Sequence, residues 1–360
     1  MKYYLDNAAT TPLCKAAKEV IKANLDTYAN PSSKHILGRS VRQMIDNARK
    51  TVAEEINCNP DEIFFTSGAS EANSWILQSF KSILTTTAEH HSVLNAAKSC
   101  KNFDLIDCTT SGVVMSALED TLYYKNYECV SIQHVNNEIG YINDIKAIRE
   151  LVPENTLFHV DATQSIPHMK VDVKSLGIDA MSFSGHKFGA MKGIGVLYVK
   201  KKWQYKLKRL IYGGSQERKY RGGTENVLGI LSLEAAFKVR KLDGFKEQVN
   251  AFKDMLDNRT VRYNTRQEDS IKTGIISVTI DRVESESLML LLEMEDIFVS
   301  AGSACAGSGE VSHVLKAIGM TDTEARATIR ISIGHDLSPA DMTYVAGRIA
   351  KKSEYFAKFA

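Results

Sequence analysis

A lysine follows directly on a predicted buried strand, in a run of small residues that ends Ser184-Gly-His-Lys187. The apolar strand before it should end inside the protein, where an ammonium group is costly unless it is paired or used chemically. A buried lysine that loses its proton readily can act as a nucleophile and form a Schiff base with a carbonyl compound. We therefore expect Lys187 to be catalytic.

Asp161 follows another predicted apolar strand, residues 157–160. A carboxylate at the end of a strand either caps the next element or binds a cationic atom of a ligand, and this segment alone favours neither reading. A Schiff-base lysine further along the chain favours a pyridinium partner, because a carboxylate there keeps the ring nitrogen protonated and the ring an electron sink.

Three further segments have polar groups next to predicted strand ends. A strand over 62–66 passes through Ser67-Gly-Ala-Ser70 into a helix, whose free N–H groups suit a phosphate, although a plain tight turn is the commoner meaning of such a segment. His90 follows the strand 82–85 and could stack on a planar ring or move protons, whereas a structural role is the default for a histidine. His186 could reach a phosphate or pack locally.

Cys305 lies at the centre of a segment, 300–309, built almost wholly of Gly, Ala and Ser. Small residues favour a mobile, exposed loop. A thiol on such a loop can enter a pocket, attack, and carry its product outward, while the alternative is an incidental cysteine. Arg330 falls inside a β-rich run, and a buried arginine usually binds a carboxylate of the protein or of a substrate.

Alternating helical and strand-like patterns must position these residues. We expect strands at 62–66, 82–85, 126–132, 157–160, 180–183 and 194–199, and helices at 39–57, 70–82, 91–100 and 143–151. This order predicts an α/β fold with a mostly parallel sheet that binds ligands at the carboxyl ends of its strands.

The pattern changes after Gly223. Residues 225–256 resemble a long helical connector, and a smaller α+β lobe follows, with strands at 273–280, 297–300 and 327–332 and helices at 284–295 and 311–318. We predict a large domain over 15–255 and a small domain made of 1–14 and 256–360, which carries Cys305.

Bulk properties exclude several classes of protein. The chain has 360 residues and a formal net charge of +2, so no global field requires nucleic acid or a membrane. No apolar run approaches ~18 residues and no signal peptide is recognisable, so we expect no membrane span. Six scattered cysteines without a CxxC pair indicate a reducing cytoplasm rather than disulfides or structural zinc. The lysine-rich stretch 200–209 favours a solvated face over a contact with RNA or a partner.

Taken together, these segments resemble the cysteine desulfurase family, pyridoxal-phosphate enzymes of fold type I related to the class V aminotransferases. The likeness keeps its order over nearly the whole chain and rests on residues 4–12, 30–33, 65–69, 89–90, 134–140, 159–164, 182–187, 192–195, 221–226 and 302–305. The chain departs from the family pattern at Ala190-Met191, where Gly-Pro is usual, and at Pro167-His168, where Gly-Lys is common.

The resemblance implies a role for each matching residue. Lys187 would hold pyridoxal phosphate covalently, with Asp161 on the ring nitrogen, His90 stacked on the ring and Gln164 on the phenolic oxygen. The phosphate would be bound by Ala69, Ser70, Ser184 and His186, and by Thr224 from the second subunit of a homodimer. Asn137 would lie by the cofactor or substrate, Asn30 and Arg330 would hold the substrate carboxylate, and Cys305 would become a persulfide.

The implied reaction converts L-cysteine into L-alanine and passes the sulfur to an acceptor protein, an iron–sulfur scaffold or a thiolation enzyme. No resident metal is implied, although Cys305 could serve as a transient ligand of an iron–sulfur cluster. A histidine near the ring is a candidate base for the Cys305 thiol. Two alternatives stay open: a selenocysteine lyase or another enzyme of the class V aminotransferase type, and a catalytically inactive sulfur-transfer scaffold.

Overall fold

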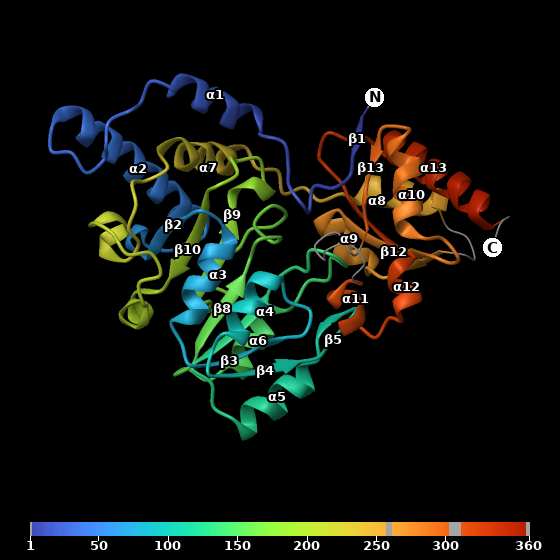
Figure 1. Ribbon diagram of the computed structural model, residues 1–360, viewed down its shortest axis with the longest axis horizontal. Coiled ribbons are helices and arrows are strands. Elements are labelled where there is room, and N and C mark those ends of the chain that lie inside the picture. Colours follow the sequence, from blue (N-terminus) through green and yellow to red (C-terminus); the bar gives the residue numbers. More distant parts are fainter. Residues whose placement is uncertain (1, 257–260, 302–310, 358–360) are drawn as a thin grey trace.

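The computed structural model describes residues 2–256, 261–301 and 311–357, arranged as two lobes of unequal size (Figure 1). Residue Cys305 and the rest of 302–310 lie outside the described residues. The larger lobe is built on a seven-stranded sheet and the smaller one on a four-stranded sheet. Among the described residues, no helix is both long enough and apolar enough to cross a membrane.

The large sheet is mixed but mostly parallel. Its strands, in spatial order, are β2 (Ile63–Thr66), β10 (Gly195–Val199), β9 (Ala180–Ser184), β8 (Leu157–Asp161), β7 (Cys129–Gln133), β3 (Ser82–Thr86) and β4 (Asn102–Ile106). Strand β10 runs antiparallel to both of its neighbours, and the remaining pairs are parallel. The central strands are buried along their whole length, as sheets covered on both faces require. The predicted α/β class is confirmed.

Helices cover both faces of this sheet. The large lobe contains α1 (Lys15–Ala23), α2 (Ile36–Glu55), α3 (Ala69–Gln78), α4 (His91–Lys98), α5 (Met115–Tyr124), α6 (Ile145–Leu151), α7 (Val227–Val239), a hairpin of β5 (Cys108–Thr109) and β6 (Gly112–Val113), and the 3₁₀ segments η1 (Pro60–Glu62), η2 (Gly185–Lys187), η3 (Lys201–Lys206) and η4 (Gln216–Lys219). Helices α2, α6 and α7 contribute to one apolar core, and α3 and α4 contribute to the other.

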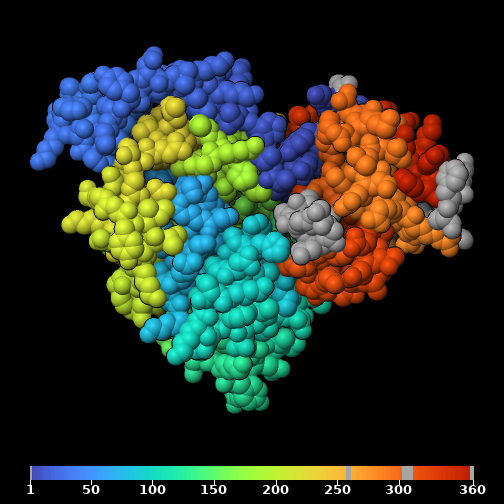
Figure 2. Space-filling view, viewed as in Figure 1, coloured from blue at the N-terminus to red at the C-terminus, as the bar shows by residue number. Residues whose placement is uncertain are grey.

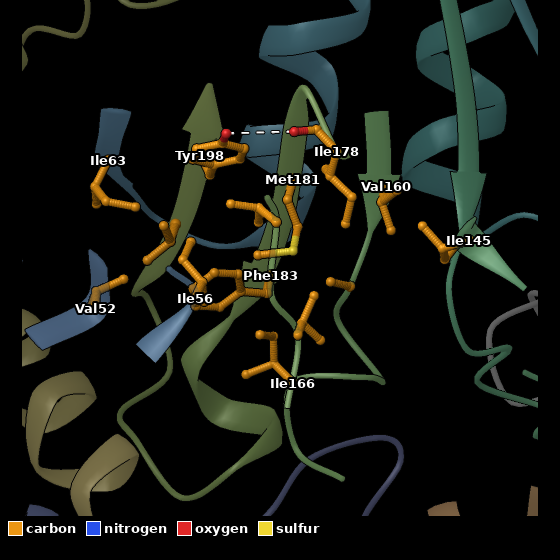
Figure 3. Close-up of a cluster of buried hydrophobic side chains, with 14 of the residues drawn as sticks. Val52, Ile56, Ile63, Ile145, Val160, Ile166, Ile178, Met181, Phe183 and Tyr198 are labelled. Atoms are coloured by element: carbon orange, nitrogen blue, oxygen red, sulfur yellow. Dashed lines mark hydrogen bonds between the residues drawn. The ribbon is translucent and has the colours of Figure 1, made fainter. Parts of the chain in front are cut away.

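The first of these cores fixes the strand that leads to Lys187. Met181 and Phe183 on β9 both point into it, beside Val160 of β8 (Figure 3). Tyr198 of β10 is packed there as well, and its hydroxyl donates to the carbonyl of Ile178 at 3.5 Å. Burying a side chain of this size stabilises the fold by about 1.5–3 kcal/mol. The strand end is therefore held rigidly where the site requires it.

The small lobe packs helices against an antiparallel sheet. The sheet order is β11 (Val261–Tyr263), β12 (Ile275–Ile280), β15 (Thr328–Ser332) and β14 (Ser300–Ala301), and the helices are α8 (Lys246–Leu256), α9 (Gln267–Thr273), α10 (Ser285–Glu293), α11 (His313–Ala317), α12 (Asp322–Arg326) and α13 (Pro339–Ala357). The N-terminal strand β1 (Tyr3–Tyr4) pairs in parallel with β13 (Ile297–Phe298) in the same lobe.

The long connector expected over 225–256 is two helices, and that expectation was wrong. Helix α7 ends at Val239. Gly244, in the linker to α8, has a φ of +72°, a backbone conformation that residues with a side chain rarely adopt. Phe237 belongs to the core of the large lobe, whereas Phe245 belongs to that of the small lobe. The apolar contacts thus change lobes between α7 and α8; the domain boundary after residue 255 stays a prediction.

The N-terminal segment connects the two lobes, as the dark blue surface between them shows (Figure 2). Leu5 is buried in the core of the small lobe. Further along, the Thr11 hydroxyl donates to the carbonyl of His186, and the N–H of Gly189 donates back to that hydroxyl. Residues 6–10 therefore lie beside the end of β9, where they form part of a cavity.

Candidate active site

A cavity of about 670 Å³ lies at the carboxyl ends of the parallel strands, between the two lobes. The large sheet contributes the residues that follow β8 and β9, and helix α3 contributes its N-terminus. The N-terminal segment and Arg330 of β15 close the other side. Its position agrees with the sequence expectation that ligands bind at this edge of the sheet.

Lys187 lies at the end of the short 3₁₀ turn η2 that follows β9. Its Nζ donates to the carbonyls of Ala8 and Ala9, both at 2.7 Å. The side chain is half-buried rather than enclosed, which corrects the expectation from the sequence. The turn carries the lysine off the buried strand to the cavity wall, where the two carbonyls compensate the ammonium group for its partial loss of water.

Asp161 is the last residue of β8, and each of its carboxylate oxygens accepts a hydrogen bond from the protein. Oδ1 accepts from the N–H of Thr163 at 2.9 Å, and Oδ2 accepts from Nδ2 of Asn73 on α3 at 2.7 Å. Asp161 is 6% exposed and lines the cavity. Thr163 also lines the cavity, and its hydroxyl is buried without a partner. An orphaned hydroxyl beside an oriented carboxylate indicates a wall built to receive a polar ligand.

His90 precedes α4 and caps it. Its Nδ1 accepts from the N–H of Ser92 at 3.1 Å and lies 2.8 Å from the Ser92 hydroxyl. A nitrogen that accepts from a backbone N–H carries no proton, so in the neutral ring the proton lies on Nε2. Burial lowers the pKa of His90, and the charge of Asp161 partly offsets this. The ring is therefore neutral near pH 7 and suited to stacking.

The turn Ser67–Ser70 lies at the N-terminus of α3, on the cavity wall. Gly195 of β10 allows the turn to approach, because a Cβ there would lie 2.5 Å from the Cα of Gly68. The N–H of Ser67 donates to Glu71, which in turn binds Arg221 through both carboxylate oxygens. The helix dipole and the remaining N–H groups make this end of α3 suitable for an anion.

Ser184 and His186, at the end of β9, also line the cavity. Ser184 is the last residue of β9, and His186 lies on the turn that follows. Nδ1 of His186 lies 3.1 Å from the Thr10 hydroxyl. Burial, with the nearby charges of Lys187 and Lys192, lowers the pKa of His186 to about 4. At neutral pH His186 is a neutral hydrogen-bonding group.

Arg330 faces these residues from the small lobe. Its Nη1 donates to the carbonyl of Asn137 at 3.0 Å, and its Nη2 donates to Oδ1 of Asp6 at 2.6 Å. Its Nε is buried without a partner. The guanidinium is thus held from two sides, with donor capacity left for a carboxylate in the cavity.

The structure brings most of the sequence-predicted residues together in this cavity and places two described ones, Asn30 and Thr224, outside it. The wall includes Ala69, Ser70, His90, Asn137, Asp161, Gln164, Ser184, His186, Lys187 and Arg330. Gln164 donates to the carbonyl of Ala8 at 2.7 Å. Asn30 is exposed in the loop after α1, and its side chain accepts from the N–H of Ser32. Cys305 lies outside the described residues.

Thr224 is the second described residue that lies outside the main cavity. It is exposed and lines a neighbouring hollow of about 170 Å³, which shares Ser67 and Gly193 with the main cavity. Beside it, the buried carboxylate of Glu225 forms an ion pair with the half-buried Arg42 at 2.7 Å. Thr224 is therefore exposed near the turn Ser67–Ser70.

Sequence reasoning missed Asp6, Asn73 and Thr163. Asp6 and Thr163 belong to the quoted motifs 4–12 and 159–164, so an acidic or hydroxyl residue inside those motifs was the available signal. Asn73 lies one turn into α3 and its partner Asp161 is 88 positions away, so nothing in its local sequence indicates the contact.

Comparison with known proteins identifies the group to which this fold and site belong. The family model for aminotransferase class-V matches residues 3–345. The cysteine desulfurase IscS of Pseudoalteromonas translucida is 37% identical over 368 residues, which cover 95% of this chain and 90% of that protein. The IscS of Dictyoglomus turgidum is 36% identical over 375 residues, which cover 97% of this chain and 94% of that protein.

The chain belongs to the aminotransferase class-V family, within the cysteine desulfurases.

Solved structures agree with this assignment. A NifS-like protein superposes with a TM-score of 0.90 and 30% identity, covering 99% of this chain and 100% of its own. A structure titled SspA in complex with cysteine has a TM-score of 0.81 and 32% identity, covering 92% of this chain and 99% of its own.

The family is pyridoxal-phosphate dependent, and the donors of the cavity fit that cofactor. A lysine amine suits its aldehyde, a buried carboxylate suits its ring nitrogen, and a helix N-terminus with Ser184 suits its phosphate. The buried, unpartnered hydroxyl of Thr163 supplies one more polar group on the same wall.

Proposed function

We propose that this protein is a pyridoxal-phosphate-dependent enzyme that converts L-cysteine into L-alanine and captures the sulfur as a persulfide on Cys305. The observation that carries the proposal is that Lys187, Asp161 and Arg330 line one cavity although they come from three different elements. The curated relatives named cysteine desulfurase support the reaction, and the solved neighbour with bound cysteine supports the substrate.

Each wall of the cavity has a separate task. Lys187 would hold the cofactor and, as a free amine, move the proton at the substrate Cα. Asp161, oriented by Asn73 and Thr163, would keep the ring nitrogen protonated. When bound, pyridoxal phosphate withdraws electrons from the amino acid, which acidifies its Cα proton and weakens its Cβ–S bond.

The substrate carboxylate would be bound by Arg330. Its Nε is buried without a partner. A carboxylate that accepts from both Nε and Nη2 would form the bidentate pair that guanidinium groups favour. Asp6 already occupies one position on Nη2, so the substrate must share or displace that contact. This competition would limit binding to ligands with a strong anionic group.

The role of Cys305 is proposed from its sequence context and family likeness. Its thiolate attacks the sulfur of the substrate, so that an S–S bond forms while the Cβ–S bond breaks. The electron pair of the broken bond stays on the substrate carbon, which then takes up a proton and leaves as L-alanine. The persulfide would pass to an acceptor protein, an iron–sulfur scaffold or a thiolation enzyme.

A homodimer would place Thr224 near the cofactor phosphate of a second copy. The segment from α1 to α2 stands out from the body of the large lobe (Figures 1 and 2). It exposes Leu25, Tyr28 and Ile36 at 64%, 86% and 72% of their surfaces. Large apolar side chains left exposed on one protruding segment favour an interface. Light scattering that finds a stable, active monomer would contradict the dimer.

Two variants test the reaction with one cysteine control. Lys187→Ala should lower L-alanine formation by about 10²–10⁴-fold, because a positioned proton-transfer group contributes that much. Cys305→Ser should keep the cofactor absorbance and lose sulfide release from L-cysteine in the presence of a thiol reductant. Cys58→Ser, a half-buried cysteine away from the cavity, should behave like the unaltered protein.

Two outcomes would contradict the proposal. Sulfide release by Cys305→Ser at the unaltered rate would remove the persulfide step and leave another reaction of the same family. A purified protein that stays colourless after incubation with pyridoxal phosphate would support the inactive scaffold instead.

A further inference from the structure

Glu138 is a buried acid directly behind the cavity. It lies in the loop between β7 and α6, it is 7% exposed, and its neighbour Asn137 lines the cavity. The side chain of Asn136 accepts from the N–H groups of both Glu138 and Ile139, at 2.8 and 2.9 Å. These bonds fix the loop, so the direction of the Glu138 side chain is set by the fold.

The Glu138 carboxyl contacts the N-terminus of α11. Oε2 accepts from the hydroxyl of Ser312 at 2.5 Å, and that hydroxyl also accepts from the N–H of Leu315 at 3.2 Å as the cap of α11. A serine that bonds both its helix and a buried carboxyl is fixed in one rotamer. Glu138 therefore connects a loop of the large lobe to a helix from the C-terminal part of the chain.

Helix α11 has two further anchors on the large lobe. Nε2 of His313 lies 2.8 Å from the carbonyl of Glu89, the residue before His90. Val314 and Leu315 are buried in an apolar cluster with Ile139 and other large-lobe residues. The start of α11 is thus placed relative to the cavity wall, with Glu138 as its charged contact.

The Glu138 carboxyl also interacts electrostatically with Arg330. The charge of Arg330 favours the ionised form of Glu138, and Nη1 of Arg330 donates to the carbonyl of Asn137, one residue away. Glu138 does not line the cavity. Its influence on a ligand must therefore pass through Asn137 and Arg330.

We propose that Glu138 is a positioning residue of the reaction, which holds the Asn137–Arg330 contact and the N-terminus of α11 in one arrangement. The proposal rests on the proposed function, because that function assigns the substrate carboxylate to Arg330. Glu138 itself touches neither substrate nor cofactor.

The protonation of Glu138 gives this role a measurable signature. Burial raises the pKa of Glu138 to about 7, against the opposing effects of Ser312 and Arg330. The groups that face it are Ser312 from α11 and Arg330 from β15, and Asp6 binds the far side of the same guanidinium. Ionisation near pH 7 strengthens the attraction to Arg330, so substrate binding should change across the neutral range.

The raised pKa of Glu138 also makes the stability of the folded protein depend on pH. The pKa of Glu138 is raised in the folded protein, so its contribution to stability is present below the ordinary pKa of a glutamate and is lost as pH rises through about 7. An uncharged replacement should remove this dependence.

The decisive variant is Glu138→Gln, which can still accept from Ser312 but carries no charge. We expect KM for L-cysteine to rise about 3- to 10-fold with kcat changed less, since one buried charge near Arg330 is lost. The change of kcat/KM near pH 7 should flatten, and the melting temperature of the protein without cofactor should depend less on pH. Glu154→Gln, an exposed glutamate between α6 and β8, is the matched control and should match the unaltered enzyme.

A second variant separates the two contacts. Ser312→Ala removes the bond to α11 but leaves the charge beside Arg330, so the pH dependence near 7 should persist. If Glu138→Gln fails to fold, Glu138→Asp should keep the pH dependence and raise KM. A Glu138→Gln protein with unaltered KM and pH profile would overturn the inference, provided that the unaltered enzyme forms L-alanine. An unaltered enzyme that forms none would contradict the proposed function instead.

Discussion

The two walls of the cavity hold their polar groups in different ways. We call Asp161, Lys187, Ser184, His186 and the N-terminus of α3 the sheet wall, and Asp6, Asn137 and Arg330 the arginine wall. In the sheet wall, neutral partners such as the Asn73 amide and backbone carbonyls hold the charged groups. In the arginine wall, a cation is held by the carboxylate of Asp6 and lies near a second acid, Glu138.

The two walls also differ in whether a titratable group near them changes charge close to pH 7. His186 of the sheet wall and the neighbouring His90 have pKa values lowered by burial, so both rings are neutral near pH 7. Glu138, behind the arginine wall, has a pKa raised to about 7. Histidines that stay neutral suit a resident cofactor, and an acid that titrates near pH 7 behind the arginine wall suits a substrate that must enter and leave.

Among variants that leave Lys187 and Cys305 in place, the largest effect should come from the arginine wall. Arg330→Gln should lower kcat/KM for L-cysteine by about 10²-fold or more, because breaking a buried charge pair costs about 2–5 kcal/mol. Cofactor absorbance should be unchanged, since the sheet wall is intact. Arg262→Gln, which loses an exposed pair with Glu324, is the control. Loss of the cofactor together with activity would show that the two walls are not separable.

A smaller effect should come from the support of the sheet wall. Asn73→Ala removes a donor from the buried Asp161 carboxylate, and a bond to a charged group contributes about 1.5–3 kcal/mol. We expect pyridoxal phosphate to bind roughly tenfold more weakly or worse in an absorbance titration. KM for L-cysteine, measured with saturating cofactor, should change little. Asn95→Ala on the exposed face of α4 is the control, and an equal loss in that variant would refute a specific role for Asn73.

The sequence allowed one wall to be predicted more fully than the other. Asp161 and Lys187 follow buried parallel strands, and the ends of such strands meet at one edge, so their proximity follows from the strand pattern. Arg330 was also predicted, but its partner Asp6 is 324 positions away on a segment without regular structure. Local patterns carry no information about such a contact. The interruption between α7 and α8 is a different case, because Gly244 in the linker is a local signal that the expectation of one long helix overlooked.

The smallest effect should come from His186. Because the pKa of its ring is lowered to about 4, it meets an anion as a neutral donor rather than as a cation. His186→Gln keeps a neutral hydrogen-bonding group, so pyridoxal phosphate should bind only about threefold to tenfold more weakly, the effect of one neutral hydrogen bond. Sulfate does not titrate near neutral pH. It should therefore bind to the cofactor-free protein equally well at pH 6 and at pH 8. A marked loss of sulfate binding between these values, absent in His186→Gln, would show that the His186 ring is charged at pH 6 and would contradict its lowered pKa.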